Sequence, residues 1–180
     1  KTKLIIPLGY KIIRLALEFL SELESKGHKG IKVSINISVI QLLRNGFVRN
    51  LERLIKDMNV DPNDVGIELT ESVFASNHQE VNNILMELRA LGLSVSLDDF
   101  GTGYSSLSRE RELNIDCLKI DRSFIKRLSM FEEDHAITAD IISMGHKLRH
   151  CVIAEGVDEE RQLEYLRRNG CDKVQGYLIG

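Results

Sequence analysis

The hydrophobic positions of this 180-residue chain follow two periods in alternation. Short runs rich in apolar and β-branched residues, typical of buried strands, alternate with segments in which apolar residues recur every three to four positions, typical of amphipathic helices. The strands are predicted at 31–38, 65–72, 94–99, 116–121, 151–157 and 172–178. The helices are predicted at 4–26, within about 39–59, and at 79–91, 105–113, 134–148 and 159–168, with a loop between 121 and 134.

This alternation predicts an α/β fold in which parallel strands are joined by right-handed helical crossovers. Two architectures remain open, a doubly wound open sheet and a (β/α)8 TIM-type barrel with about six of its eight strands in this segment. Each predicted strand carries a polar residue at or near its C-terminal end. These residues are Asn36, Glu68 with Glu71, Asp98 with Asp99, Lys119 with Asp121, Glu155 and Gln175. In a barrel all these ends meet on one face, whereas an open sheet concentrates polar groups near one switch point, so the pattern favours the barrel.

Composition limits the class of protein. The chain has 24 Lys and Arg against 27 Asp and Glu, and this net charge of −3 argues against a broad DNA- or RNA-binding surface. There is no apolar run long enough for a membrane span and no signal peptide. Cys117, Cys151 and Cys171 lie far apart and match neither a zinc motif nor a disulfide framework. We therefore expect a single cytoplasmic domain over 1–180.

Asp98 and Asp99 are the most informative pair. Two adjacent carboxylates at the end of an apolar strand repel each other and resist desolvation, and a bound cation stabilises such a pair. Ligands that are all oxygen favour Mg²⁺, Mn²⁺ or Ca²⁺. A solvated turn with an Asp cap is the alternative for these two residues taken alone.

The predicted convergence of strand ends extends this argument. The oxygen ligands available there are those of Asn36, Glu68, Asp98, Asp99 and Glu155. They can hold one or two divalent cations, and a two-metal site favours phosphoryl transfer. Lys119 suits the orientation of a water or a phosphate oxygen, and Gln175 can hydrogen-bond a ligand. The residues alone therefore indicate a metal-dependent hydrolase or lyase.

Each of these residues also has an ordinary structural interpretation when taken alone. Asn36 could satisfy backbone groups at a strand end, and Lys119 with Asp121 could form a common ion pair. His146 and His150 lie four residues apart on a predicted helix, where a solvated helix end is expected rather than a metal pair. The joint placement of the polar residues, at the end of every strand, is what favours a site.

Six motifs occur in order along the chain: SINIS with Gln41, IELTES, SLDDFGTGYSSL, LKIDRSFI, IAEGV and CDKVQGY. Together they resemble the EAL domain family, the cyclic di-GMP phosphodiesterases of bacterial signalling, over essentially the whole chain. The resemblance implies a (β/α)8 barrel with one antiparallel strand. It also implies hydrolysis of cyclic di-GMP to linear pGpG with Mg²⁺ or Mn²⁺. We expect two ions in the full site, and inhibition by Ca²⁺ because its looser coordination fits a two-metal transition state poorly.

The resemblance also assigns roles to individual residues. It implies that Asn36, Glu68, Asp98 and Asp99 carry the metals, that Lys119 positions the attacking water with Asp121 beside it, and that Glu155 is the general base or orients the water. It implies that Gln175 contacts ligand or water, that Glu71 braces the DFGTG loop, and that Asp158 lies near the guanine contact. Asp158 departs from the family, which usually has Glu there.

A second departure concerns the motif that names the family. The tripeptide Glu-Ala-Leu is absent from these residues, so we expect a domain truncated at the N-terminus and slightly at the C-terminus. A catalytically inactive cyclic di-GMP sensor or protein-interaction module is therefore the alternative to an active enzyme. The resemblance further implies a homodimer through the DFGTG loop and an upstream sensor or diguanylate-cyclase domain.

Overall fold

The computed structural model describes residues 4–101, 113–128 and 135–179. The chain divides into two compact units, one made of residues up to Val95 with 113–114, the other of the remaining described residues from Ser96 onward. The predicted helix at 105–113 falls almost entirely outside the described residues. Within the described ranges, no helix is both long and apolar enough to cross a lipid bilayer.

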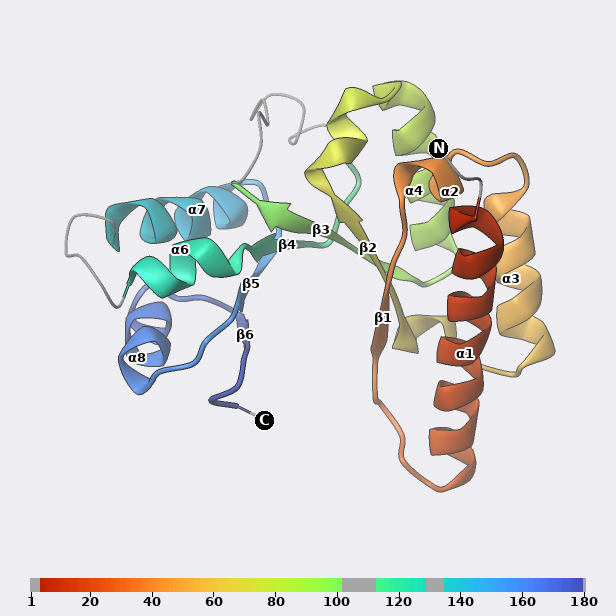
Figure 1. Cartoon of the computed structure of the whole chain (residues 1–180), viewed down its shortest axis with the longest axis horizontal. Helices are drawn as coiled ribbons and strands as arrows, with labels where there is room; N and C mark the ends of the chain where they lie inside the picture. The colour runs from red at the N-terminus through yellow and green to blue at the C-terminus, as the bar shows by residue number, and fades with distance from the viewer. Residues whose placement is uncertain (1–3, 102–112, 129–134, 180) are drawn as a thin grey trace. The chain divides into compact units, whose positions relative to one another are not determined.

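The first unit pairs two parallel strands with helices. In chain order it contains α1 (Ile5–Ser25), β1 (Val33–Asn36), α2 (Val39–Leu42), α3 (Phe47–Asp57), a 3₁₀ turn (Pro62–Asp64), β2 (Val65–Thr70), a second 3₁₀ segment (Glu71–Ala75) and α4 (His78–Ala90). Strands β1 and β2 run in register from the Val33–Val65 pair to the Asn36–Glu68 pair. Helix α1 lies along β1 and beside α3 (Figure 1).

The core of the first unit consists of apolar side chains on the inner faces of these elements. Its members include Ile13 and Leu17 of α1, Ile35 of β1, Leu51 and Ile55 of α3, Ile67 of β2, and Leu85 and Leu88 of α4. The i, i+4 spacing within each helix places these residues on one face, as the sequence pattern predicts. Helix α1 also leaves a second apolar set exposed: Ile5, Leu8, Ile12, Leu15 and Phe19.

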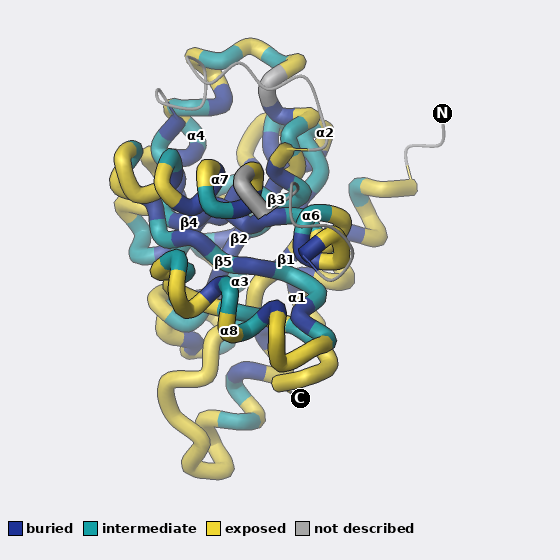
Figure 2. Tube along the Cα trace, turned by 90° about the vertical axis from the view of Figure 1, so that its left-hand side faces the viewer, coloured by how far each residue is buried: buried dark blue, intermediate teal, exposed yellow. Residues whose placement is uncertain are grey.

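The second unit is built on parallel strands in chain order. These are β3 (Ser94–Phe100, of which the first two residues belong to the first unit), β4 (Cys117–Ile120), β5 (Cys151–Glu155) and β6 (Lys173–Gln175). The helices of this unit are α6 (Arg122–Arg127), α7 (His135–Lys147) and α8 (Glu160–Arg168). Figure 2 shows that β4 and β5 run largely through buried residues, among them Leu118, Ile120, Val152 and Ala154.

Within the described residues, the predicted elements match the observed ones apart from their ends, the division of the 39–59 segment into α2 and α3, and one helix. The strands predicted at 31–38 and 172–178 are shorter in the structure, where they cover Val33–Asn36 and Lys173–Gln175. Helix α6 was predicted as loop, which was wrong. Asp121 caps it by accepting a hydrogen bond from the Ser123 N–H at 2.9 Å, and its six residues are too few for a helical period to stand out.

Candidate active site

The centre of the candidate site is Lys119, a buried lysine in the middle of β4. Lys119 is only 4% exposed. Its ammonium nitrogen lies 2.6 Å from Glu155 Oε1 and 3.4 Å from Asp98 Oδ1. A buried ammonium is costly without ionic partners, and here two carboxylates from the neighbouring strands supply them. The alternative interpretation, an ion pair between Lys119 and Asp121, was wrong. The ionic partners of Lys119 are Glu155 and Asp98.

The two aspartates reach the site because β3 is irregular at its C-terminal end. The pairing register between β3 and β4 shifts between Leu97 and Phe100, and Asp99 has φ of 55°. Consecutive side chains of a regular strand point to opposite faces, whereas a bulge redirects one of them. The Asp99 N–H donates to Asp98 Oδ1 at 3.0 Å, which holds this local conformation. The prediction that the strand stops on the two aspartates was therefore wrong, because β3 bends through them and ends at Phe100.

The carboxylates form a group that fits a divalent cation. One oxygen each from Asp98, Asp99 and Glu155 lies within 4.8 Å of the others, and all three residues are only partly exposed. Lys119 can neutralise one of three negative charges, so the group retains a net affinity for a cation. Because every donor is a carboxylate oxygen, the hard ions Mg²⁺, Mn²⁺ and Ca²⁺ fit the donor set.

Glycines shape the turns that leave the two carboxylate-bearing strands. Gly101 follows β3 with φ of 95°, and a Cβ there would lie 2.8 Å from the Phe124 ring. Gly156 follows Glu155 with φ of 73°, and a Cβ there would lie 2.7 Å from Arg122 Cγ. Both positions combine a left-handed backbone with close packing, which favours glycine. Arg122 is thereby placed against the turn after Glu155, a neighbour that the sequence analysis missed although it directly follows the LKID motif.

The first unit carries another pair of predicted site residues. Asn36 and Glu68 are register partners at the C-terminal ends of β1 and β2, and the Ile37 N–H donates to the Glu68 carbonyl at 2.9 Å. The sequence-based expectation that parallel strands bring these two residues together is met within this unit. Glu71 begins the 3₁₀ segment that directly follows β2.

The remaining predicted residues have defined surroundings in the second unit. Gln175 on β6 is the register partner of Glu155. Asp121 is the N-cap of α6, so its carboxylate serves a structural bond in this structure. Asp158 Oδ1 accepts from the Tyr177 N–H at 3.4 Å, while the Asp158 N–H donates to Gln162 at 2.8 Å. The ligand contacts of these three residues stay predictions.

Comparisons with known proteins agree on one family. The EAL domain family model matches residues 1–180. The chain is 39% identical over 168 residues to the cyclic di-GMP phosphodiesterase NbdA of Pseudomonas aeruginosa, covering 93% of this chain and 22% of that protein. It is 36% identical over 180 residues to the bifunctional diguanylate cyclase/cyclic di-GMP phosphodiesterase MucR of the same organism, covering 100% of this chain and 26% of that protein. The chain thus spans about a quarter of the length of these curated relatives.

A solved structure supports the same assignment. The PaMucR phosphodiesterase in complex with c-di-GMP matches with a TM-score of 0.91 and 35% identity, over 98% of this chain and 72% of that one. This likeness confirms the α/β barrel-type fold that the strand-end pattern predicts. The motif-based resemblance is confirmed with it, and the chain belongs to the EAL domain family.

Proposed function

We propose that the chain hydrolyses one phosphodiester bond of cyclic di-GMP, giving linear pGpG, with the help of Mg²⁺ or Mn²⁺. The observation that carries the proposal is the group formed by Asp98, Asp99, Glu155 and Lys119 at the end of the β3–β5 strands. The named activity of the relatives NbdA and MucR supports the choice of substrate. In the reaction, water adds its oxygen to phosphorus, and the bond from phosphorus to the leaving ribose oxygen breaks.

The residues divide this work by their chemistry. Asp98, Asp99 and Glu155 would hold a cation through their oxygens, and Asn36 and Glu68 offer a second set of oxygen ligands. A bound divalent cation polarises the phosphodiester and makes a nearby water more acidic. Glu155 accepts the proton of the attacking water, and Lys119, whose ammonium lies 2.6 Å from it, fixes the orientation of that carboxylate. Gln175 and Asp158 contact the dinucleotide.

The competing hypothesis is a domain that binds cyclic di-GMP without cleaving it. A glutamate retained in the Glu-Ala-Leu motif of a longer protein containing this chain would favour the enzyme, and a replaced glutamate would favour the sensor. The retained carboxylates and Lys119 favour the enzyme.

We further propose that the domain works in the cytoplasm as one module of a larger signalling protein. Relatives several times longer than this chain, one of them named as bifunctional with a diguanylate cyclase, support this context. An upstream sensor or cyclase domain and a homodimer through the loop after β3 complete the proposal. Calcium should inhibit, because its looser coordination fits a compact phosphoryl-transfer site poorly.

A cleavage assay tests the proposal. Cyclic di-GMP is incubated with this chain and with a longer protein containing it, each with Mn²⁺, Mg²⁺, Ca²⁺ or chelator, and pGpG is quantified by chromatography. We expect Mn²⁺- or Mg²⁺-dependent pGpG formation that Glu155→Gln abolishes. Glu160→Gln, an exposed position at the start of α8, is the matched control and should behave as the wild type.

Two results would contradict the proposed enzyme. Binding of cyclic di-GMP without cleavage by the longer protein would establish the sensor. Cleavage that persists in chelator would remove the cation from the mechanism.

A further inference from the structure

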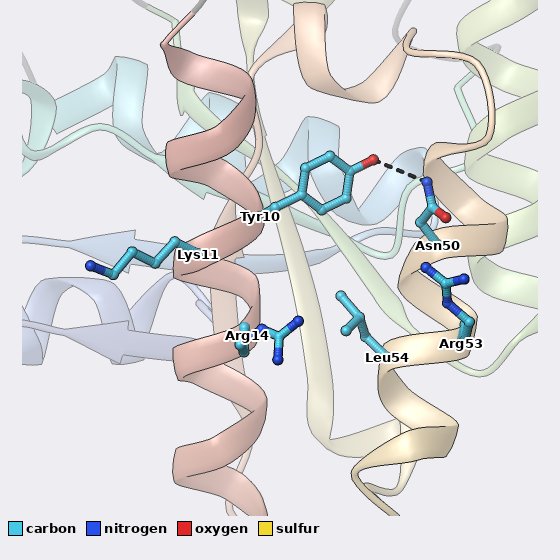
Figure 3. Close-up of a pocket in the computed structure, with 6 residues that line it drawn as sticks. All are labelled: Tyr10, Lys11, Arg14, Asn50, Arg53 and Leu54. Carbon is cyan, nitrogen blue, oxygen red and sulfur yellow. Dashed lines mark hydrogen bonds between the residues drawn. The ribbon is translucent and has the colours of Figure 1, made fainter.

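A groove separate from the strand ends lies on the first unit, between α1 and α3 (Figure 3). Its volume is about 460 Å³, and its lining consists of Tyr10, Lys11 and Arg14 from α1 and Asn50, Arg53 and Leu54 from α3. None of the lining residues is acidic. The proposed function leaves this groove without a role.

Helical spacing brings the important side chains to the same side. Tyr10 and Arg14 are four residues apart on α1, and Asn50 and Leu54 are four apart on α3. Figure 3 shows Tyr10 and Arg14 extending from α1 toward α3, while the Lys11 ammonium points away from α3. The two guanidinium groups of Arg14 and Arg53 therefore provide the main positive charge of the groove, and Lys11 adds to it from the edge.

A hydrogen bond joins the two helices across the groove. Asn50 Nδ2 donates to the Tyr10 hydroxyl oxygen at 3.3 Å (Figure 3). In this arrangement the Tyr10 hydroxyl hydrogen and the Asn50 carbonyl oxygen remain as a donor and an acceptor for a ligand. The groove thus combines cationic donors, a neutral polar pair and the apolar side chain of Leu54.

The basic residues of this groove differ from others on the same helices. Lys26 pairs with Glu22 on α1, and Lys56 pairs with Glu52 on α3, both at i, i+4 spacing. Glu18 and Asp57 stand four residues after Arg14 and Arg53, where similar pairs could form. Over the described ranges, however, neither Arg14 nor Arg53 forms an ion pair. An uncompensated basic groove on a chain of net charge −3 is therefore a local feature rather than a consequence of composition.

We propose that the α1–α3 groove binds the phosphate group of a small phosphorylated molecule, with Arg14 and Arg53 as its principal ligands. Guanidinium groups match phosphate oxygens in shape and form paired, charge-assisted hydrogen bonds. The volume is in the range of small-molecule sites, and Tyr10 and Leu54 offer a surface for the rest of the ligand. Two sources share this chemistry, a nucleotide and free inorganic phosphate.

Calorimetric titration with guanosine monophosphate, inorganic phosphate and guanosine, each in chelator, tests the site without loading the carboxylate group. We expect guanosine monophosphate or phosphate to bind, and added salt to weaken binding. Arg14→Gln and Arg53→Gln should each weaken binding by about tenfold or more, and Lys11→Gln by less. Arg49→Gln is the matched control, since this exposed arginine of α3 lies outside the groove lining.

The outcomes separate the sources and test the proposal. Tighter binding of the nucleotide than of phosphate assigns a role to the Tyr10–Leu54 surface, and equal binding assigns the site to phosphate alone. The proposal is wrong if neither phosphorylated probe binds at millimolar concentration, if guanosine binds as tightly as its monophosphate, or if the Arg14 and Arg53 variants bind like the wild type. The result does not depend on whether cyclic di-GMP is cleaved. Unchanged thermal midpoints of the variants would show that the fold is retained.

Discussion

The two ends of the strands in the second unit carry opposite chemistry. At one end, Cys117 begins β4 and Cys151 begins β5, and the two are register partners. Burial, followed by the hydrogen bond with Cys151, raises the pKa of the Cys117 thiol to about 12. At the other end, Asp98 and Glu155 flank the ammonium of Lys119. Thiols thus lie at the start of these strands, and charged groups lie at their end.

Burial alone does not decide whether a side chain at these strands is charged. Lys119 is buried like Cys117, but ionic partners from both neighbouring strands stabilise its charge. The Cys171 thiol, by contrast, donates to the carbonyls of Lys173 and Val152, and burial raises its pKa to about 11. Two carboxylates thus stabilise Lys119 in its charged form, whereas burial favours the neutral form of the Cys117 and Cys171 thiols.

The largest effect is expected at the carboxylate end. Glu155→Gln removes the proposed base and one cation ligand, so turnover of cyclic di-GMP should fall by about 10²-fold or more. The fold should be retained because Asp98 remains as an ionic partner of Lys119, although the loss of one of the two carboxylate partners lowers the free energy of unfolding. Steady-state kinetics and a thermal unfolding scan of the same sample measure both quantities. Full activity in this variant would remove Glu155 from the mechanism.

Lys119→Met tests whether the Lys119 ammonium stabilises the carboxylate end of the strands. Removing the ammonium leaves the carboxylates of Asp98 and Glu155 to repel each other, and we expect a loss of about 3 kcal/mol in the free energy of unfolding without cations. Mn²⁺ should then stabilise this variant more than the wild type, since it replaces the missing positive charge. Chemical denaturation with and without Mn²⁺ measures this, and Lys126→Met on the exposed side of α6 is the control. Equal stabilisation of both proteins by Mn²⁺ would contradict the account.

At the thiol end, Cys117→Ala should lower the free energy of unfolding by only about 1 kcal/mol and leave turnover of cyclic di-GMP unchanged. The pKa of this thiol is higher in the folded chain than in the unfolded one, so the stability linked to it is complete below about pH 9. It is lost as the pH rises toward about 12. Denaturation at pH 7 and pH 10 should show a smaller alkaline loss in the variant. A large loss of activity would assign the thiol end a catalytic role.

The smallest effect is expected at Asp172, beside β5. Burial acts to raise the pKa of this carboxyl, but hydrogen bonds from the Val152 N–H at 2.7 Å and from His146 at 2.9 Å outweigh it and lower the pKa. The lowered pKa gives stability that is present above about pH 4 and lost as the pH falls below it. Because the Asp172 side chain is 42% exposed, Asp172→Ala should lower the free energy of unfolding by only about 1 kcal/mol at pH 7. Denaturation at pH 7 and pH 3 should show the difference shrinking in acid.

Much of this architecture was predictable from the sequence, because it depends on local periodicity and on the rule that parallel strands align their C-terminal ends. That rule places Asn36 beside Glu68 and brings Lys119 into the same strand-end group as Glu155. The bulge that brings Asp98 and Asp99 to one side was not predictable, since it arises from the register of β3 against β4. His146 lies exposed in the last turn of α7, as expected, and also pairs with Asp172, which lies 26 residues later in the chain. His150, expected at the same solvated helix end, is instead buried.

The most direct test of the account is the thermal stabilisation of the chain by Mn²⁺ in two double variants. Asp98→Asn with Glu155→Gln alters the carboxylate end, and Cys117→Ser with Cys151→Ser alters the thiol end. We predict that Mn²⁺ raises the unfolding temperature of the wild type and of the cysteine variant, but not of the carboxylate variant. An equal rise in all three proteins would place the cation elsewhere and contradict the assignment of the site.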